Sequence, residues 1–230
     1  MTAQQPAIEL SQLRFAWPGG TTLLDIAAFE LKRGERVFLR GPSGSGKSTL
    51  LGLIGGVLQP GAGTIRVLGE NMQQLSAADR DQFRGQHLGF IFQMFNLIPY
   101  LSVLDNVLLP ARFNRARAAR LAASGPAHEA RRLLAALGLG DPALQQRSVN
   151  ELSIGQQQRV AAARALLGSP ELIIADEPTS ALDHDARHDF LQLLLDECRQ
   201  RGSSLLFVSH DTALGPLFDR VESIAELNRA

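Results

Sequence analysis

The chain has 230 residues, of which 45% are hydrophobic and 20% charged, and its 23 basic and 23 acidic residues give a formal net charge of zero. These values exclude a wholly disordered chain, and the absence of a basic excess argues against nucleic acid as the main partner. Because Cys198 is the one cysteine, an internal disulfide framework is also excluded, and we expect this residue to be a small side chain on a helix.

The N-terminal sequence MTAQQPAIEL lacks the basic start and the apolar stretch of a secretory signal. The longest apolar run, residues 50–58, is interrupted by glycine and is shorter than the ~18 to 20 residues that a membrane-spanning helix needs. We therefore expect a cytoplasmic protein with no direct membrane span, which meets a membrane only through a partner.

Residues 8–17 and 24–31 alternate roughly between apolar and polar side chains, which predicts two strands joined by a turn and paired as an antiparallel sheet. Shorter apolar runs at 37–39, 172–175 and 205–208 are typical of buried parallel strands. We expect active residues to follow at the carboxyl ends of these three strands.

The segment GPSGSGKS follows the apolar run 37–39 and matches the phosphate-binding loop G-x-x-x-x-G-K-[S/T] at every fixed position. Its glycines let successive N–H groups point at one anion, and a helix that begins near Lys47 directs its positive end at the same point. Lys47 would bind the outer phosphates, and the Ser48 hydroxyl would bind Mg²⁺. The sequence therefore predicts a nucleoside triphosphate site made by Gly41, Pro42, Ser43, Gly44, Ser45, Gly46, Lys47, Ser48 and Thr49.

The region 73–148 is rich in Ala, Arg, Gln and Leu, and leucines recur at near-helical spacing within 133–139. This pattern predicts a helical lobe inserted in the sheet domain. We expect the inserted helical subdomain at approximately 93–149, within a single domain whose core is formed by approximately 1–92 and 150–230.

Two stretches within this region allow alternative interpretations. The arginines of 111–120 are expected on a solvated helix face, with contact to anionic lipid headgroups as the alternative. The unusually apolar stretch 93–107 indicates a docking groove, or simply packing inside the helical subdomain.

The run LIIADEP, residues 172–178, is a hydrophobic strand that ends in two adjacent acids. Strand alternation directs Asp176 and Glu177 differently, so that one acid can serve Mg²⁺ while the other meets water. We expect Asp176 to hold the metal, directly or through a water, and Glu177 to orient or deprotonate the water that attacks the γ-phosphate. A strand that merely ends in a polar loop is the alternative.

Further motifs occur in an order that resembles the nucleotide-binding subunits of ABC transporters, and the resemblance covers nearly all of the chain. LSIGQQQR (152–159) is similar to the ABC signature sequence, and IFQ, which ends at Gln93, is similar to the Q-loop. SALD (180–183) resembles the D-loop, and VSHD (208–211) contains His210 at the position of the switch histidine. The resemblance implies an α/β P-loop NTPase with a mostly parallel central sheet, flanking helices, an N-terminal antiparallel β-subdomain and an inserted α-helical subdomain.

Ser153 is a good N-cap, so that its hydroxyl and the amides after it form an anion site at a helix start. In the family this site binds the γ-phosphate held by a second copy, which implies a head-to-tail dimer with two ATP molecules between the subunits. Gly155, Gln156 and Asp183 are assigned to nucleotide binding on the same ground. Ile154 occupies a position where the family usually has glycine, and because a β-branched residue resists positive φ, we expect an altered or stiffer turn.

Gln93 resembles a nucleotide sensor that reaches Mg²⁺ or the attacking water from the junction of sheet and helices. His210 resembles the residue that contacts the γ-phosphate and steadies the catalytic acid, although a histidine at a strand end can also be a plain hydrogen-bonding residue. Trp17 is placed where the family stacks an aromatic side chain on adenine, with Phe15 as a rival and core packing as the alternative. The resemblance thus implies the catalytic residues Glu177, His210 and Gln93 and the metal ligands Ser48, Gln93 and Asp176.

FQMFNLIP (92–99) and LSIGQQQRVAAARAL (152–166) are most similar to the ATPases of lipoprotein-releasing, macrolide-exporting and cell-division complexes. This resemblance implies an ATPase that powers a membrane ABC transport complex and uses ATP and Mg²⁺. A second copy of the chain and integral membrane permease subunits are the implied partners, and the implied location is the inner face of the cell membrane. A regulatory or mechanotransmission role without substrate translocation is the alternative.

Overall fold

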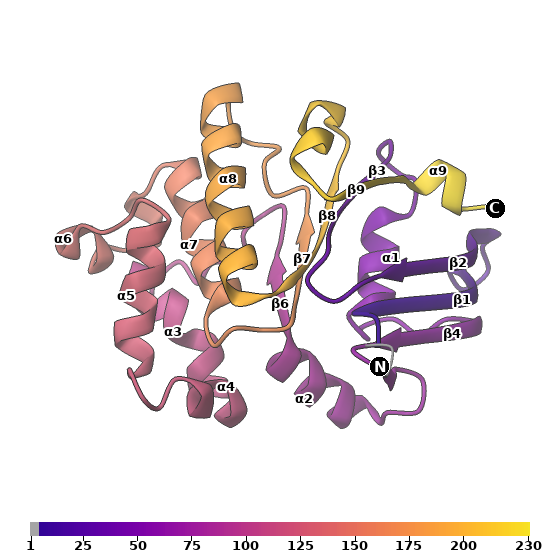
Figure 1. Ribbon diagram of the computed structural model, residues 1–230, viewed down its shortest axis with the longest axis horizontal. Helices are drawn as coiled ribbons and strands as arrows, with labels where there is room; N and C mark the ends of the chain where they lie inside the picture. The colour runs from indigo at the N-terminus through magenta and orange to yellow at the C-terminus, as the bar shows by residue number, and fades with distance from the viewer. Residues whose placement is uncertain (1–4) are drawn as a thin grey trace.

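The computed structural model describes residues 5–230, which form a four-stranded and a five-stranded sheet with helices around them (Figure 1). The smaller sheet has the order β2-β1-β4-β5, and its strands are β1 (Ile8–Ala16), β2 (Thr22–Leu31), β4 (Ala62–Val67) and β5 (Glu70–Asn71). The larger sheet contains, in order, β6 (Leu88–Ile91), β7 (Leu172–Asp176), β8 (Ser204–Ser209), β3 (Arg36–Arg40) and β9 (Arg220–Ser223). The pairs of the smaller sheet are antiparallel and those of the larger sheet parallel, which confirms the predicted α/β fold.

The helices lie between these strands in the chain and after the last of them. They are α1 (Lys47–Ile54), α2 (Ala77–His87), α3 (Val103–Phe113), α4 (Arg115–Arg120), α5 (Pro126–Ala136), α6 (Pro142–Gln145), α7 (Ile154–Leu166), α8 (His184–Arg201) and α9 (Ile224–Leu227). Two 3-10 helices, η1 (Val149–Glu151) and η2 (Thr212–Leu217), complete the described elements.

A β-bulge explains why the apolar pattern of β1 breaks its alternation. Ile8 and Leu10 are buried before the break and Leu13 after it, whereas two consecutive residues between them are exposed. The pairing of β1 with β4 shifts at this point, and Gln12 has a φ of 50°. The extra residue returns the later apolar side chains to the core face, as a bulge does.

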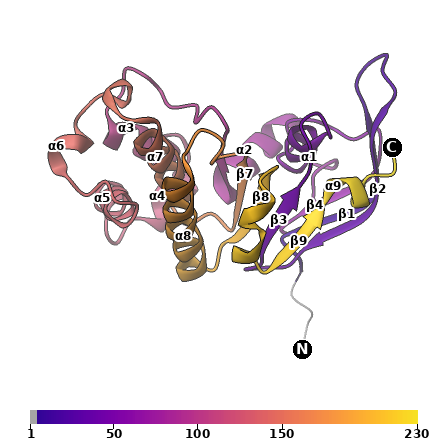
Figure 2. The same cartoon turned by 90° about the horizontal axis from the view of Figure 1, so that it is seen from above.

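Successive residues of the parallel strands face two different cores. Phe38 and Phe207 belong to a core that they share with α3, α5, α7 and α8. Their neighbours Val37 and Leu206 belong to a second core, shared with α1 and the antiparallel sheet. Figures 1 and 2 show α1 and α7 on opposite sides of the parallel sheet. The near-continuous apolar runs of the sequence are explained by this two-sided burial.

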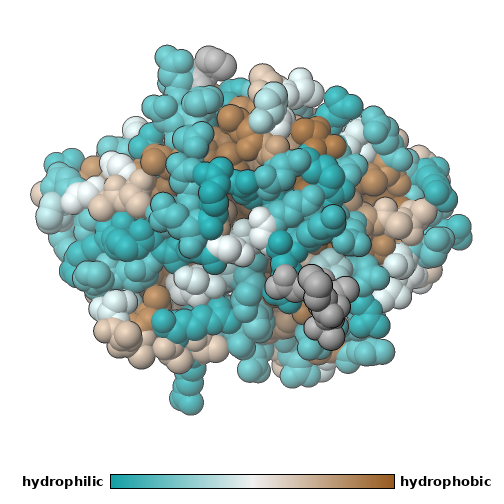
Figure 3. Space-filling view, viewed as in Figure 1, coloured by the Kyte–Doolittle hydropathy of each residue, from teal (hydrophilic) through white to brown (hydrophobic). Residues whose placement is uncertain are grey.

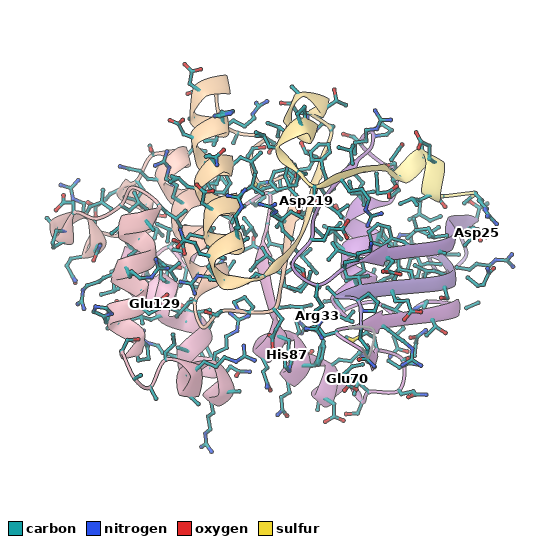
Figure 4. The ribbon with its side chains drawn as sticks, in the orientation of Figure 1. Asp25, Arg33, Glu70, His87, Glu129 and Asp219 are labelled. Atoms are coloured by element: carbon teal, nitrogen blue, oxygen red, sulfur yellow. The ribbon has the colours of Figure 1, made fainter. Side chains whose placement is uncertain are left out.

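An ion-pair network joins α5 to α8. Glu197 is 4% exposed, and Arg132 Nη2 and Arg201 Nε lie 2.7 and 3.1 Å from its Oε2 atom. Arg201 also pairs with Glu129, which is labelled on α5 in Figure 4. Burial opposes ionisation of Glu197, but the hydrogen bonds from both arginines outweigh it and hold the pKa of Glu197 below its usual value.

The prediction of a solvated arginine face for 111–120 is wrong at Arg117. This side chain is 2% exposed, its Nη1 atom donates to Leu167 O at 3.1 Å, and its Nη2 atom donates to Leu88 O. The carbonyl groups lie just past the end of α7 and at the start of β6, and α4 covers both. Burial lowers the pKa of Arg117 to about 10. A guanidinium remains suitable here because it carries several donors on one plane.

Cys198 lies buried on α8, as expected of a small helix residue, and burial raises the pKa of its thiol to about 12. The face of the molecule shown in Figure 3 is mainly hydrophilic, with separate hydrophobic areas. No helix within residues 5–230 combines the length and the apolar character needed to cross a membrane.

Candidate active site

The glycine-rich loop joins β3 to the start of α1. Gly44 and Gly46 have φ values of 80° and 88°, a left-handed conformation that side chains disfavour. A Cβ atom at Gly46 would lie 2.8 Å from Cδ2 of Leu24, so a larger residue there would also have to displace the end of that side chain. Gly46 directly precedes α1 and has no side chain, which leaves the positive end of this helix open to an anion.

Lys47 directs its charge into this loop. Its side chain is 5% exposed, and the Nζ atom donates to Gly41 O at 2.9 Å and to Pro42 O at 2.7 Å. The same atom lies 3.4 Å from Glu177 Oε1. A buried ammonium beside backbone donors fits a polyphosphate. The phosphate oxygens can take the place of the long contact between Lys47 and the carboxylate of Glu177.

Asp176 ends β7 and lies beside Ser48. Burial raises the pKa of Asp176, and the charge of Glu177 adds to this effect, while the neighbouring Ser48 hydroxyl and the charge of Lys47 oppose it. No group of three or more His, Cys, Asp or Glu side chains within the described residues could hold a metal ion. One carboxylate and one hydroxyl fit Mg²⁺ all the same, because this ion commonly keeps waters and takes its remaining ligands from phosphates.

Glu177 leaves the strand with a φ of 44°, which is uncommon for a residue with a side chain. Its amide donates to Val208 O at 2.9 Å, which anchors it to the neighbouring strand β8. The carboxylate then lies between two partners, with Oε1 facing Lys47 and Oε2 at 3.0 Å from His210 Nδ1. Strand alternation alone therefore does not explain how the two acids diverge.

The structure brings together the residues predicted at the carboxyl ends of β3, β7 and β8. β7 pairs with β8 in parallel, with Asp176 opposite Val208, so His210 follows at the same edge as the two acids. His210 is 56% exposed and Glu177 is 13% exposed. The imidazole holds one oxygen of the carboxylate, so the carboxylate can act as a base toward a water beside a bound phosphate.

Gln93 follows β6, which pairs in parallel with β7, so it lies at the same edge as Asp176. Its side chain is exposed, and no hydrogen bond among residues 5–230 joins it to Ser48 or Asp176. Its roles as sensor and metal ligand therefore stay predictions.

Trp17 is 49% exposed and Phe15 is 7% exposed, and the two rings meet edge to face at 5.1 Å. Burial leaves Phe15 no free face for a base, which favours Trp17 between the two candidates. Phe15 pairs with Leu24, the residue that lies against Gly46, so this end of the hairpin adjoins the phosphate loop. The stacking role of Trp17 stays a prediction.

Ser153 caps α7 with a reciprocal pair of hydrogen bonds. Its Oγ atom accepts from Gln156 N at 3.3 Å, and Gln156 Oε1 accepts from Ser153 N at 3.0 Å. This capping box gives Gln156 a local structural role, and the S-x-x-Q spacing is its signal in the sequence. Ile154 is the first residue of α7 and is 53% exposed, so the expected conflict with positive φ does not arise.

The structure does not bring Ser153 to Lys47, because α7 and α1 lie on opposite sides of the parallel sheet (Figures 1 and 2). Gly155 belongs to the same helix start as Ser153. Asp183 is exposed at the start of α8, where its Oδ1 atom accepts from Ala186 N at 2.9 Å. The site is therefore assembled from the phosphate loop, the two acids and the histidine, without the signature segment of the same chain.

Sequence reasoning missed Arg164, which joins α7 to the segment after β6. Its guanidinium donates to Phe95 O and Asn96 O, each at 2.6 Å, and burial lowers its pKa. Both partners are left-handed, with φ values of 58° and 51°. The contacts depend on residues far apart in the chain, so no local pattern could have revealed them.

Comparisons with known proteins identify the family of this chain. The family described as ABC transporter matches residues 24–180. The chain is 41% identical over 224 residues to the lipoprotein-releasing system ATP-binding protein LolD of Anaeromyxobacter dehalogenans, covering 96% of this chain and 91% of that protein. It is 40% identical over 222 residues to the macrolide export ATP-binding/permease protein MacB of Rhodopseudomonas palustris, covering 93% of this chain and 32% of that protein. The dimeric post-hydrolysis structure of the ATP-binding cassette MJ0796 with ADP and Pi matches with a TM-score of 0.78 and 32% identity, covering 94% of this chain and 93% of that chain.

Proposed function

Because this chain belongs to the ABC transporter family, we propose that it is the ATPase subunit that powers a membrane transport complex. The observation that carries the proposal is the position of Glu177 between Lys47 and His210, next to an open helix N-terminus. This arrangement offers a cation for phosphate, a base for water and a residue that holds the base in place.

The residues of this chain supply the groups that hydrolysis needs. The loop amides and Lys47 bind the phosphates, and this frees Glu177 from its contact with Lys47. Glu177 then accepts a proton from a water that attacks the γ-phosphorus, the bond to the β-γ bridging oxygen breaks, and ADP and phosphate are formed. His210 keeps the carboxylate of Glu177 in place through Nδ1. Mg²⁺ held by Ser48 and Asp176, with Gln93 as a further ligand, would neutralise charge on the phosphates.

A second copy completes the proposed site. Ser153 and Asp183 are exposed, and no hydrogen bond among residues 5–230 joins either of them to the phosphate loop of its own chain, as expected of residues that act on a partner's nucleotide. The dimeric structure of MJ0796 supports this arrangement in a similar chain. We propose a head-to-tail pair in which Ser153, with Gly155 and Gln156 in the same helix turn, closes over the nucleotide held by the other copy.

We propose that the permease docks in a cleft of about 940 Å³. It extends from Ser48 and Asp176 past Phe92 to Phe113, and both phenylalanines are exposed. The names of LolD and MacB support such a partner, since one belongs to a lipoprotein-releasing system and the other includes a permease. Through that partner the chain would lie at the inner face of the cell membrane.

An assay of phosphate release from ATP in the presence of Mg²⁺ tests the catalytic assignment. We expect the purified chain to hydrolyse ATP, and we expect Glu177→Gln to bind ATP normally while losing most of the turnover and prolonging the dimer. Normal turnover in Glu177→Gln would contradict the assignment of Glu177.

Reconstitution tests the transport assignment. The chain is copurified with its membrane subunit, the subunit is identified, and the complex is placed in vesicles. ATP-dependent movement of a substrate supports transport. ATP hydrolysis that changes the membrane subunit without moving any substrate would favour the regulatory alternative.

A further inference from the structure

Arg187 contacts two of the segments that the proposed function uses. It lies in the first turn of α8, and its Nη2 atom donates to Leu182 O at 2.9 Å. Its Nη1 atom forms an ion pair with the carboxylate of Asp211. Leu182 belongs to the segment 180–183, in which the other three residues are exposed, and Asp211 directly follows His210. One guanidinium therefore bridges the loop expected to face a second copy and the loop of the histidine.

The contacts continue from Asp211 to the catalytic acid. The amide of Asp211 donates to Ser209 Oγ at 3.1 Å, and its Oδ1 atom accepts from Ala213 N at 3.1 Å. The carboxylate that Arg187 holds is thus tied to the backbone that follows His210, and the backbone of Asp211 is tied to the hydroxyl of Ser209, which precedes His210. His210 Nδ1 in turn lies 3.0 Å from Glu177 Oε2.

The bridge is better protected from water than an ordinary surface ion pair. The side chains of Arg187 and Asp211 are 22% and 27% exposed, and Arg187 also makes its hydrogen bond to a backbone carbonyl. For comparison, the pair of Arg199 and Asp196 on the same helix has side chains 58% and 41% exposed. Screening by water makes an exposed pair of this kind nearly neutral in its effect.

We propose that Arg187 is a positioning residue that connects the segment 180–183 to His210. Contact of a second copy with Asp183 is transmitted through Leu182 O, Arg187 and Asp211 to the histidine, and so to Glu177. The inference rests on the proposed function, because it needs the catalytic role of Glu177 and the dimer. In this proposal Arg187 contacts neither the nucleotide nor the attacking water, and it acts on hydrolysis through Asp211 and His210.

Arg187→Gln tests this role, with Arg199→Gln as the matched control on the same helix. ATP affinity, kcat and the thermal midpoint are measured for both variants. We expect Arg187→Gln to lower kcat by roughly 10- to 100-fold with ATP affinity unchanged, because a small displacement of catalytic groups has effects of this size. Arg199→Gln should match the unaltered chain.

Two further variants separate positioning from simple loss of structure. Asp211→Asn should lower kcat to a similar extent, and the double variant should be no worse than either single variant, because both act through one bridge. Arg187→Lys, which keeps the charge, should recover part of the lost kcat. Unchanged kcat in Arg187→Gln, multiplicative losses in the double variant, or a parallel loss of ATP affinity and thermal midpoint would each overturn the inference. Failure of the proposed function is distinguishable, since it would appear as no hydrolysis by the unaltered chain or full turnover by Glu177→Gln.

Discussion

At the scale of single residues, Glu177 links the phosphate loop to the histidine. One carboxylate oxygen faces Lys47 and the other faces His210, and the left-handed backbone of Glu177 makes both contacts possible. Such strained residues cost about 1 to 3 kcal/mol and cluster at active sites. In the proposed mechanism, phosphate binding takes Lys47 away from this carboxylate.

Lys47→Ala tests the phosphate-binding cation. We expect ATP affinity to fall by roughly 10- to 100-fold, because a charged hydrogen bond contributes about 1.5 to 3 kcal/mol. Equilibrium binding of a fluorescent ATP analogue measures the change. Lys32→Ala removes an exposed lysine and should bind normally. Equal affinities of Lys47→Ala and Lys32→Ala would refute the assignment.

Asp176→Asn tests the burial of a charge in the nucleotide-free chain. The pKa of Asp176 is raised, chiefly by burial, so at neutral pH its ionised form costs folding free energy. We expect Asp176→Asn to raise the thermal midpoint of the nucleotide-free chain at neutral pH. The gain should shrink as pH falls through the raised pKa and vanish below the ordinary value of 3.8, where both states are protonated.

Thermal melts from pH 4 to pH 8 without nucleotide measure this effect. Asp189→Asn, which alters an exposed residue of α8, is the control and should show no pH-dependent gain. A midpoint of Asp176→Asn that is lower than that of the unaltered chain at neutral pH would show that burial does not dominate.

At the scale of elements, α4 is attached to the core by a buried arginine. Arg117 donates to the carbonyl groups of Leu88 and Leu167, where β6 starts and α7 has just ended. The same short helix carries Arg115, which is exposed. The predicted solvated face is therefore correct for Arg115 and wrong for Arg117.

Arg117→Ala should lower the free energy of unfolding by about 2 to 4 kcal/mol, because it leaves two buried carbonyl groups without a donor. Urea unfolding followed by circular dichroism measures the loss. Arg115→Ala on the same helix should change it by less than about 0.5 kcal/mol. The interpretation fails if the two variants are equally stable.

At the scale of the whole molecule, the parallel sheet separates the two halves of the proposed composite site. The phosphate loop and α1 pack on one side, and α7 with Ser153 at its start packs on the other (Figure 2). Within one chain, the phosphate loop and Ser153 could meet only if one of the two hydrophobic cores came apart. In a symmetric pair, the phosphate loop of each copy can meet Ser153 of the other copy, so that two complete sites form. Two-fold pairing of this kind is the usual arrangement of a homodimer.

Complementation between two inactive variants tests the pairing. Lys47→Ala removes one half of the site, and Ser153→Asp keeps an N-cap while placing a negative charge where the phosphate would bind. Each variant alone should be nearly inactive. Their equal mixture should regain about a quarter of the normal ATPase activity, because half of the pairs are mixed and each mixed pair has one intact site. A mixture no more active than its components would contradict sites shared between copies.

The sequence by itself determined the features that depend on near neighbours. The phosphate loop was predictable because its contacts lie within the loop and the first turn of α1, and its glycines specify the backbone directly. The parallel strands were predictable because burial on both faces leaves a plain apolar run. The S-x-x-Q capping box at Ser153 likewise depends only on residues three positions apart.

Only the tertiary structure decided which distant groups meet. Glu177 gained Lys47 and His210 as partners because β3, β7 and β8 lie side by side in the sheet and a left-handed residue turned the carboxylate between them. Arg117 became buried because α4 covers carbonyl groups of two other elements. Local propensity acts over a few residues, whereas these contacts depend on how the sheet orders its strands and which face each helix covers.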